Sequence, residues 1–262
     1  MRLCASNIAW TSEQDEAVYQ LMNASGFEGL EIAPSRLFPD KPYDHLSDAA
    51  EFAEYVRKVY GLTVASMQSL WYGMPQRIAG TQRERSELLE YTVKALHFAD
   101  ALDCRNIVFG CPKNRRLERP EDVSIVEEFI AKIAEEAGKF GIVIALEANP
   151  EIYGTNFVNT TSEAIALVTR INHPFLKVNL DVGTMLANRE NPDTLAEKVS
   201  AINHVHISEP ELAAVKPHKE HEILSRLLKE SGYDGFVSIE MRKCESLSEL
   251  ERAINHVRRI FA

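Results

Sequence analysis

Four side chains that can bind a metal stand at or near the ends of four successive apolar segments. Glu147 closes the segment IVIALE, and Asp181 closes LKVNLD. His206 lies within HVHIS, and Glu240 closes FVSIE. Burying a carboxylate is costly unless it is paired or bound to a metal. Three carboxylates and one imidazole form a hard ligand shell that favours Mn²⁺, with Mg²⁺, Co²⁺ and Zn²⁺ as alternatives. We therefore predict one divalent metal ion at these residues, with a buried salt-bridge network as the alternative.

The segments that carry these residues belong to a longer alternation of strands and helices. Eight strands are predicted, at 2–7, 29–33, 62–67, 106–110, 142–147, 176–181, 204–208 and 236–240. Eight amphipathic helices are predicted, at 12–25, 45–60, 81–102, 121–139, 161–171, 192–200, 218–231 and 246–260. This alternation is typical of a parallel sheet in an α/β protein. Eight repeats in 262 residues favour a (β/α)₈ TIM barrel that spans residues 1–262 as a single domain.

The barrel would bring the four candidate ligands together. Active sites of such barrels lie at the carboxyl ends of the strands, where side chains from neighbouring strands face one pocket. An open doubly wound sheet is the alternative architecture, since it also alternates strands and helices. No G-x-G-x-x-G or G-x-x-x-x-G-K-[ST] motif follows any predicted strand. We therefore favour the closed barrel.

Composition narrows the class of partner. The formal net charge is −10, and no run of Lys and Arg is long enough to follow a phosphate backbone, so we expect no nucleic acid partner. The four cysteines are scattered without a C-x-x-C pair, which argues against disulfides and thiolate zinc sites. The opening residues MRLCASNIAW lack the apolar core of a signal peptide, and no segment has the ~20 apolar residues of a membrane span. We expect a cytoplasmic protein, free or as a homo-oligomer.

Five segments resemble one known family. GFEGLEIAP, IALEANP, LKVNLDVGT, INHVHISEP and SGYDGFVSIEM are similar to strands of the xylose isomerase-like barrel superfamily, also known as the sugar phosphate isomerase/epimerase family. The resemblance extends along essentially the whole chain. It implies a metal site at Glu147, Asp181, His206 and Glu240 and a sugar or polyol substrate.

The chain departs from the family pattern at one position. Many members carry a histidine three residues after the strand-end aspartate, where Thr184 stands here, so a substrate contact typical of ketose epimerases is in doubt. The branch that cleaves abasic DNA would need further histidines, and Gln68, Gly110 and Thr184 stand near those places. The resemblance therefore favours sugar chemistry over DNA cleavage.

The resemblance implies proton transfer beside a sugar carbonyl through an enediolate. Glu147 and Glu240 would act as base and acid on the substrate, as an epimerase or isomerase requires. Asp181 and His206 would mainly hold the metal. A dehydratase of a ketopolyol such as an inosose starts from the same enolisation and is the first alternative. A sugar-binding barrel without turnover is the second.

Other polar and aromatic residues near the strand ends are candidates for shaping the substrate pocket. The predicted substrate-binding residues are Asn7, Glu31, Gln68, Trp71, Thr184, Glu209 and Arg242. Trp71 would stack on an apolar sugar face and Arg242 would hold an anionic group. His204 is expected to be a hydrogen-bonded core histidine, because it shares a strand face with His206. His218 and His221 are expected on a solvated helix face.

Overall fold

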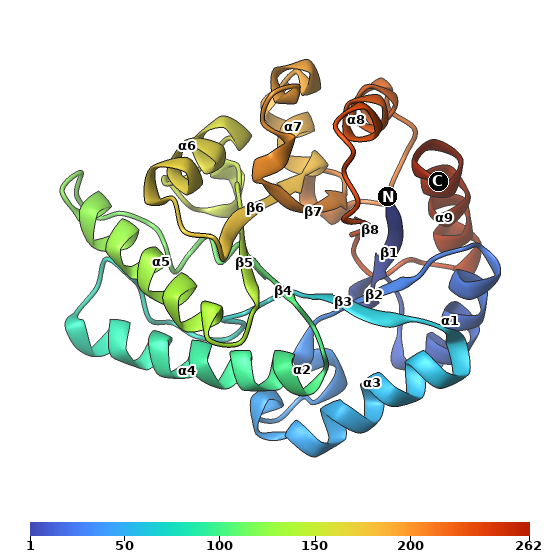
Figure 1. Cartoon of the computed structure of the whole chain (residues 1–262), viewed down its shortest axis with the longest axis horizontal. Helices are drawn as coiled ribbons and strands as arrows, with labels where there is room; N and C mark the ends of the chain where they lie inside the picture. The colour runs from blue at the N-terminus through green and yellow to red at the C-terminus, as the bar shows by residue number, and fades with distance from the viewer.

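The computed structural model describes residues 1–262, and its eight strands form a closed parallel barrel. Each strand pairs with the next along the chain, and β8 pairs with β1 to complete the ring (Figure 1). The strands are β1 Arg2–Ser6, β2 Gly29–Ile32, β3 Thr63–Met67, β4 Asn106–Phe109, β5 Val143–Glu147, β6 Leu176–Asp181, β7 Ile202–Ile207 and β8 Phe236–Ile239. The chain is therefore a TIM barrel, as predicted.

Helices surround the barrel on its outer side (Figure 1). They are α1 Asp15–Ala24, α2 Pro34–Leu37, α3 Leu46–Tyr60, α4 Gln82–Ala101, α5 Asp122–Gly138, α6 Thr161–Ile171, α7 Val182–Asn188, α8 Lys219–Glu230 and α9 Leu247–Phe261. Thr81 and Thr160 cap α4 and α6, and each accepts a hydrogen bond from the backbone of a glutamate three residues later. None of these helices combines the length and the apolar character that crossing a bilayer requires.

One hydrophobic core cluster of 65 buried residues packs the barrel together. Most strand residues are buried on both faces, as expected when helices cover a parallel sheet. The polar exceptions include Glu31, Asn179, His204 and His206, all at most 1% exposed. A buried carboxylate needs hydrogen-bond or charged partners, and the two imidazoles are the titratable groups nearest to Glu31.

One predicted helix is wrong. Residues 192–200 form two 3₁₀ turns, Pro192–Leu195 and Val199–Ala201, and the α-helix between β6 and β7 is α7. Asp181 explains the earlier start, because its side chain accepts the Thr184 backbone N–H at 2.8 Å and caps the helix directly after the strand. Arg189, at φ 56°, ends it. All eight predicted strands are present, with bounds shifted by at most two residues.

Candidate metal centre

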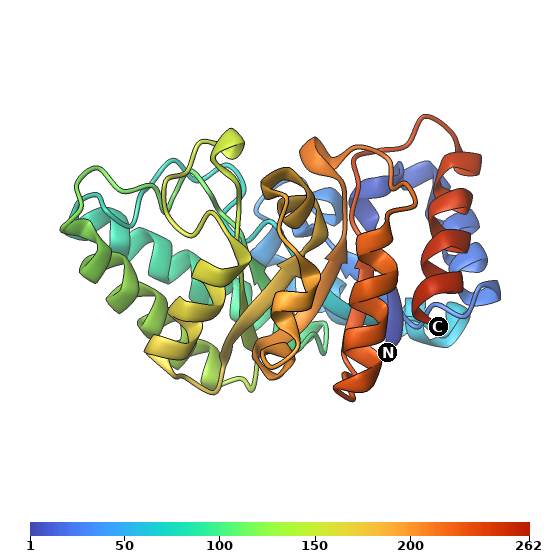
Figure 2. The same ribbon diagram turned by 90° about the horizontal axis from the view of Figure 1, so that it is seen from above.

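The four predicted ligands converge at the carboxyl ends of β5 to β8. Glu147, Asp181, His206 and Glu240 each offer one ligand atom, and these atoms all lie within 4.8 Å of one another. Nδ1 of His206 lies 3.1 Å from Glu147 Oε1 and 3.1 Å from Glu240 Oε2. Figure 2 shows the barrel from the side, with the loops that surround this mouth along its upper edge. The donor set and its size fit a divalent cation.

The electrostatics of the cluster also fit a cation. Burial raises the pKa of Glu240 to about 7, although the neighbouring His206 partly offsets this rise. Burial and then the charge of Glu147 raise the pKa of Asp181. Burial alone would also raise the pKa of Glu147, but the hydrogen bond and the charge of His206 outweigh it and lower that pKa. Crowded, desolvated carboxylates resist ionising together, and a bound cation would relieve that repulsion.

Behind His206, away from the other three ligands, stands a second buried group. Glu31 is fully buried, and its Oε2 lies 2.9 Å from His206 Nε2 and 3.0 Å from His204 Nε2. The contact with His206 is a hydrogen bond, whereas His204 Nε2 is not aligned for one. Burial alone would raise the pKa of Glu31, but the two histidines outweigh it, so its pKa is lowered. An ionised Glu31 holds a proton on Nε2 of His206. Although burial opposes it, the charges of Glu240 and Glu31 raise the pKa of His206 well above its ordinary value, so a cation at Nδ1 would displace the proton that faces the carboxylates there.

Asp181 is held by residues that follow β6 and β7. Its Oδ2 accepts hydrogen bonds from the Thr184 backbone N–H at 2.8 Å and from the Thr184 hydroxyl at 2.7 Å. The Ser208 hydroxyl donates to Oδ1, and Ser208 also accepts the Gly183 N–H at 2.8 Å. A side chain at Gly183 would clash, because its Cβ would lie 2.8 Å from Ser208 Oγ. Asp181 is thus locked in one orientation.

A cavity of about 260 Å³ opens beside the cluster on the side of β3 and β4. Its lining is Gln68, Ser69, Trp71, Tyr72, Val108, Gly110, Cys111, Pro112, Lys113, Asn114, Glu147 and Glu240. It is somewhat smaller than the ~300–1,000 Å³ pockets of drug-sized ligands, which suits a small polar molecule. Burial raises the pKa of the Cys111 thiol to about 12, so this cysteine is no nucleophile.

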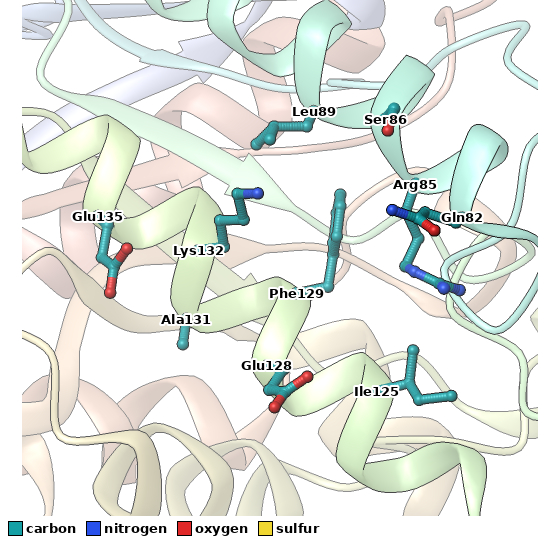
Figure 3. Close-up of a pocket in the computed structure, with 10 residues that line it drawn as sticks. All are labelled: Gln82, Arg85, Ser86, Leu89, Ile125, Glu128, Phe129, Ala131, Lys132 and Glu135. Atoms are coloured by element: carbon teal, nitrogen blue, oxygen red, sulfur yellow. The ribbon is translucent and has the colours of Figure 1, made fainter.

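A larger hollow of about 590 Å³ lies on the outer surface between α4 and α5 (Figure 3). Its walls carry charges of both signs, from Arg85 and Lys132 to Glu128 and Glu135, around Phe129. Two sets of side chains in the protein could hold a metal ion, and neither includes a residue of this hollow. The sets are Glu147, Asp181, His206 and Glu240, and Glu31, His204 and His206. Volume alone therefore does not locate the chemistry, and the barrel mouth is the candidate site.

The predicted substrate-binding residues occupy very different places. Gln68 and Trp71 line the cavity, although Trp71 is only 2% exposed and its indole donates to Thr92 Oγ1 at 2.9 Å. Glu31 lies behind His206, and Thr184 is committed to Asp181 and the Ala148 carbonyl. These two are placed to support the candidate metal ligands.

The other three predicted residues lie outside the cavity lining. Asn7 is buried, and its Oδ1 accepts the Ala33 N–H at 2.9 Å. Glu209 accepts hydrogen bonds from His218 at 2.7 Å and from the Lys216 N–H at 2.9 Å, so it orders the loop after β7. The Arg242 side chain is exposed.

Two amides near the cluster were not anticipated from the sequence. Asn179 Nδ2 donates to Glu147 Oε1 at 2.7 Å, and Asn149 Nδ2 donates to Glu147 Oε2 at 2.9 Å. Strand alternation could have revealed Asn179, because it lies two residues before Asp181 and therefore on the same strand face. Asn149 lies in a loop, where no such periodicity applies.

The expectation for the two helix histidines is wrong for His221. His221 is fully buried, and its Nδ1 lies 2.9 Å from His256 Nε2 on the neighbouring helix α9. His218 is partly exposed and contacts Glu209. His204 is 1% exposed, in agreement with a core position, but its Nε2 has no hydrogen-bond partner, so the expected hydrogen bond is not formed.

The chain is similar to known sugar epimerases. It is 27% identical to a ketose 3-epimerase of Arthrobacter globiformis over 160 residues, which cover 59% of this chain and about half (54%) of that protein. Its fold matches a structure of 3-keto-D-glucoside 4-epimerase from E. coli with a TM-score of 0.78 and 19% identity, over 99% of both chains. It matches D-psicose 3-epimerase in the presence of D-fructose with a TM-score of 0.82 and 16% identity, over 100% of this chain and 99% of the other.

A family model describes nearly the whole chain. The model of the xylose isomerase-like TIM barrel matches residues 19–260, which include all four clustered candidate ligands and seven of the eight strands. Together with the closed barrel, this match agrees with the resemblance noted in the sequence. The chain belongs to the xylose isomerase-like TIM barrel family.

Proposed function

We propose that the protein is a divalent-metal-dependent epimerase or isomerase of a sugar or polyol. The observation that carries this proposal is the pairing of Glu147 and Glu240. Both lie 3.1 Å from His206 Nδ1, and both line the cavity beside the cluster. Two carboxylates at one pocket supply the base and the acid that moving a proton between two faces of a carbon requires.

The comparisons support this class of reaction. The curated relative is named as a ketose 3-epimerase, and the two matched structures are sugar epimerases. A divalent cation at the cluster would supply Lewis-acid polarisation of a substrate carbonyl. Manganese is the preferred ion because oxygen ligands predominate and one imidazole completes the set.

Different residues of the site would transfer the proton, hold the ion and contact the substrate. One of the two glutamates removes the proton from the carbon beside the carbonyl, and the other returns a proton from its own strand, three positions around the barrel. Asp181, tied by Thr184 and Ser208, serves to hold the ion. His206, backed by Glu31, completes the ligand set. Gln68 and Trp71 form part of the wall of the cavity and would contact the substrate.

Exchange of a substrate proton with solvent tests the proposal. The Mn²⁺-loaded protein is incubated in D₂O with ketoses, aldoses and inososes, and deuterium uptake beside the carbonyl is followed by NMR. We expect Glu147→Gln and Glu240→Gln each to slow exchange by about 10²-fold or more. Glu251→Gln, on the exposed surface of α9, is the matched control and should exchange at the normal rate.

Other results of the exchange experiment would contradict the proposed function in different ways. Exchange that persists in both site variants would refute the assignment of acid and base. Loss of water from the substrate would favour the dehydratase. Mn²⁺ binding without exchange on any sugar of the panel would favour a binding protein.

A further inference from the structure

A buried arginine without a carboxylate partner lies close to the metal cluster. Arg115 is fully buried in the loop after β4, and no carboxylate oxygen lies within 4 Å of its guanidinium. Nη2 donates to Asn149 Oδ1 at 2.7 Å and to the Val158 carbonyl at 3.4 Å, whereas Nε and Nη1 have no partner. Burial lowers the pKa of Arg115 to about 10, which leaves it charged at neutral pH. A buried cation without an anionic partner destabilises the folded state, so its presence points to a role other than stability.

Its contact with Asn149 decides which way that amide faces. Arginine can only donate hydrogen bonds, so the end of the Asn149 amide that faces Arg115 must be the oxygen. The NH₂ end then faces Glu147, where it donates to Oε2 at 2.9 Å. With the amide reversed, two acceptors would face each other at Glu147 and two donors at Arg115. The guanidinium therefore ensures that Glu147 meets a donor.

The second amide at Glu147 lacks such a partner. Asn179 Nδ2 donates to Glu147 Oε1, but Asn179 Oδ1 is buried without any hydrogen-bond partner. Of the two amides that hold this carboxylate, only Asn149 has both ends satisfied. Hydrogen bonds at both ends therefore fix the orientation of the Asn149 amide, which lies on the Arg115 side of Glu147.

The surrounding backbone holds Asn149 in place. Its N–H donates to the Val158 carbonyl at 3.1 Å, and Asn159 Nδ2 donates to its carbonyl at 2.9 Å. Val158 has φ +57°, in the left-handed region that favours glycine and strains a residue with a Cβ. This strained residue presents its carbonyl to both Asn149 and Arg115. A Cβ at Gly110 would lie 2.8 Å from Glu147 Oε2, so the carboxylate also packs closely against the backbone that directly follows β4.

We propose that Arg115 is a positioning residue that fixes the Glu147 carboxylate through the oriented amide of Asn149. The inference rests on the proposed function, because Glu147 is its base or acid and one of its metal ligands. The oxygen held by Asn149 is Oε2, and the other oxygen, Oε1, faces His206. Arg115 thus sets how Oε1 is presented to the ion and to the substrate without touching either.

A purely structural role and a positioning role predict opposite results for Arg115→Met. Replacing an unpaired buried charge with an apolar chain of similar size is expected to leave the thermal midpoint unchanged or raise it. If Arg115 positions Glu147, the same variant binds Mn²⁺ about 10-fold or more weakly, as removal of a supporting residue does at other metal sites. Its kcat for proton exchange falls by up to about 10²-fold while KM changes little, because the reacting carboxylate is displaced.

Mn²⁺ affinity is measured by electron paramagnetic resonance without substrate, beside calorimetric unfolding and exchange kinetics. Arg115→Lys keeps a donor and a charge, and we expect it to recover Mn²⁺ affinity to within a few-fold of wild type. Arg36→Met is the matched control, because it breaks the 2.6 Å ion pair with Asp15 away from the cluster. It should lower the thermal midpoint and leave Mn²⁺ affinity unchanged.

Asn149→Asp keeps the question open to test if Arg115→Met fails to fold. An aspartate still pairs with Arg115 but sets a second carboxylate against Glu147 in place of the amide donor, so the presentation of Oε1 changes and the Mn²⁺ affinity of the folded variant should fall. Normal Mn²⁺ affinity and normal kcat in the folded variants would overturn the positioning role. Weakened Mn²⁺ binding in a protein whose wild type exchanges no sugar proton would support the positioning role and refute the proposed function.

Discussion

At the scale of single residues, the candidate metal ligands are oriented by hydrogen bonds with neighbouring side chains. Three of the four candidate ligands accept or share hydrogen bonds with residues outside the set: His206 with Glu31, Asp181 with Thr184 and Ser208, and Glu147 with Asn149 and Asn179. Such partners set which atom of the ligand is presented and how freely it moves. Glu31 and Thr184, which the sequence suggested as substrate contacts, lie where they can support candidate ligands in this way.

Glu31→Gln tests that arrangement at His206. Glutamine keeps the size of Glu31 but removes the charge that holds a proton on Nε2 of His206. We expect the Mn²⁺ dissociation constant to rise about 10- to 100-fold, measured by isothermal titration calorimetry. Glu28→Gln, an exposed change just before β2, should bind Mn²⁺ as the wild type does. Equal affinity in both variants would contradict a supporting role for Glu31.

At the scale of elements, α8 and α9 are joined by a buried pair of histidines. His221 on α8 and His256 on α9 lie 2.9 Å apart, and burial, followed by the charges of His256 and His218, lowers the pKa of His221 to about 3. Unfolded histidine titrates near ~6.5. The unfolded state therefore binds more protons below that pH, and stability falls as the pH drops from about 6.5 toward 3.

The size of this loss can be measured. At pH 5 the protonation of His221 in the unfolded state, which the folded state does not match, should remove about 2 kcal/mol of stability relative to pH 7, since each pH unit below the unfolded pKa contributes about 1.4 kcal/mol. Urea unfolding at both pH values should show that His221→Leu loses about 2 kcal/mol less than the wild type between pH 7 and pH 5. An unchanged pH dependence in the variant would mean that other groups cause the acid sensitivity.

At the scale of the whole molecule, the closed ring of strands predicts that metal binding stabilises the entire fold. β5, β6 and β7 each contain one candidate ligand, the fourth, Glu240, directly follows β8, and β8 closes the ring against β1. A ligand that binds only the folded state at about 100 times its dissociation constant contributes about 2.7 kcal/mol. For a protein of this size, that corresponds to a rise of about 5–10 °C in the thermal midpoint.

Calorimetry of the chelator-treated protein with and without Mn²⁺ checks this prediction and the single-domain organisation together. We expect one cooperative transition that moves as a whole when Mn²⁺ is added. Asp181→Asn, which removes the charge of one proposed ligand, should shift much less. Two separable transitions, only one of them sensitive to Mn²⁺, would contradict a single domain of residues 1–262.

The sequence by itself determined the barrel and the four clustered residues. Alternating apolar strands and amphipathic helices are local patterns, and a parallel barrel necessarily collects its strand ends at one mouth. Glu147, Asp181, His206 and Glu240 could therefore be assembled from their positions at the ends of predicted strands. The helix after β6 was missed because its start depends on Asp181 as a cap, a contact between a strand end and the next turn.

Only the tertiary structure decided what surrounds those four residues. Glu31 and His206 are 175 positions apart in the chain, and Arg115 and Asn149 are 34 apart in two different loops. Such contacts depend on how loops and strand interiors pack, which no local periodicity encodes. That packing settles whether a polar residue near a strand end lines the cavity, as Gln68 does while its amide donates to Glu31, or lies behind a candidate ligand, as Glu31 does.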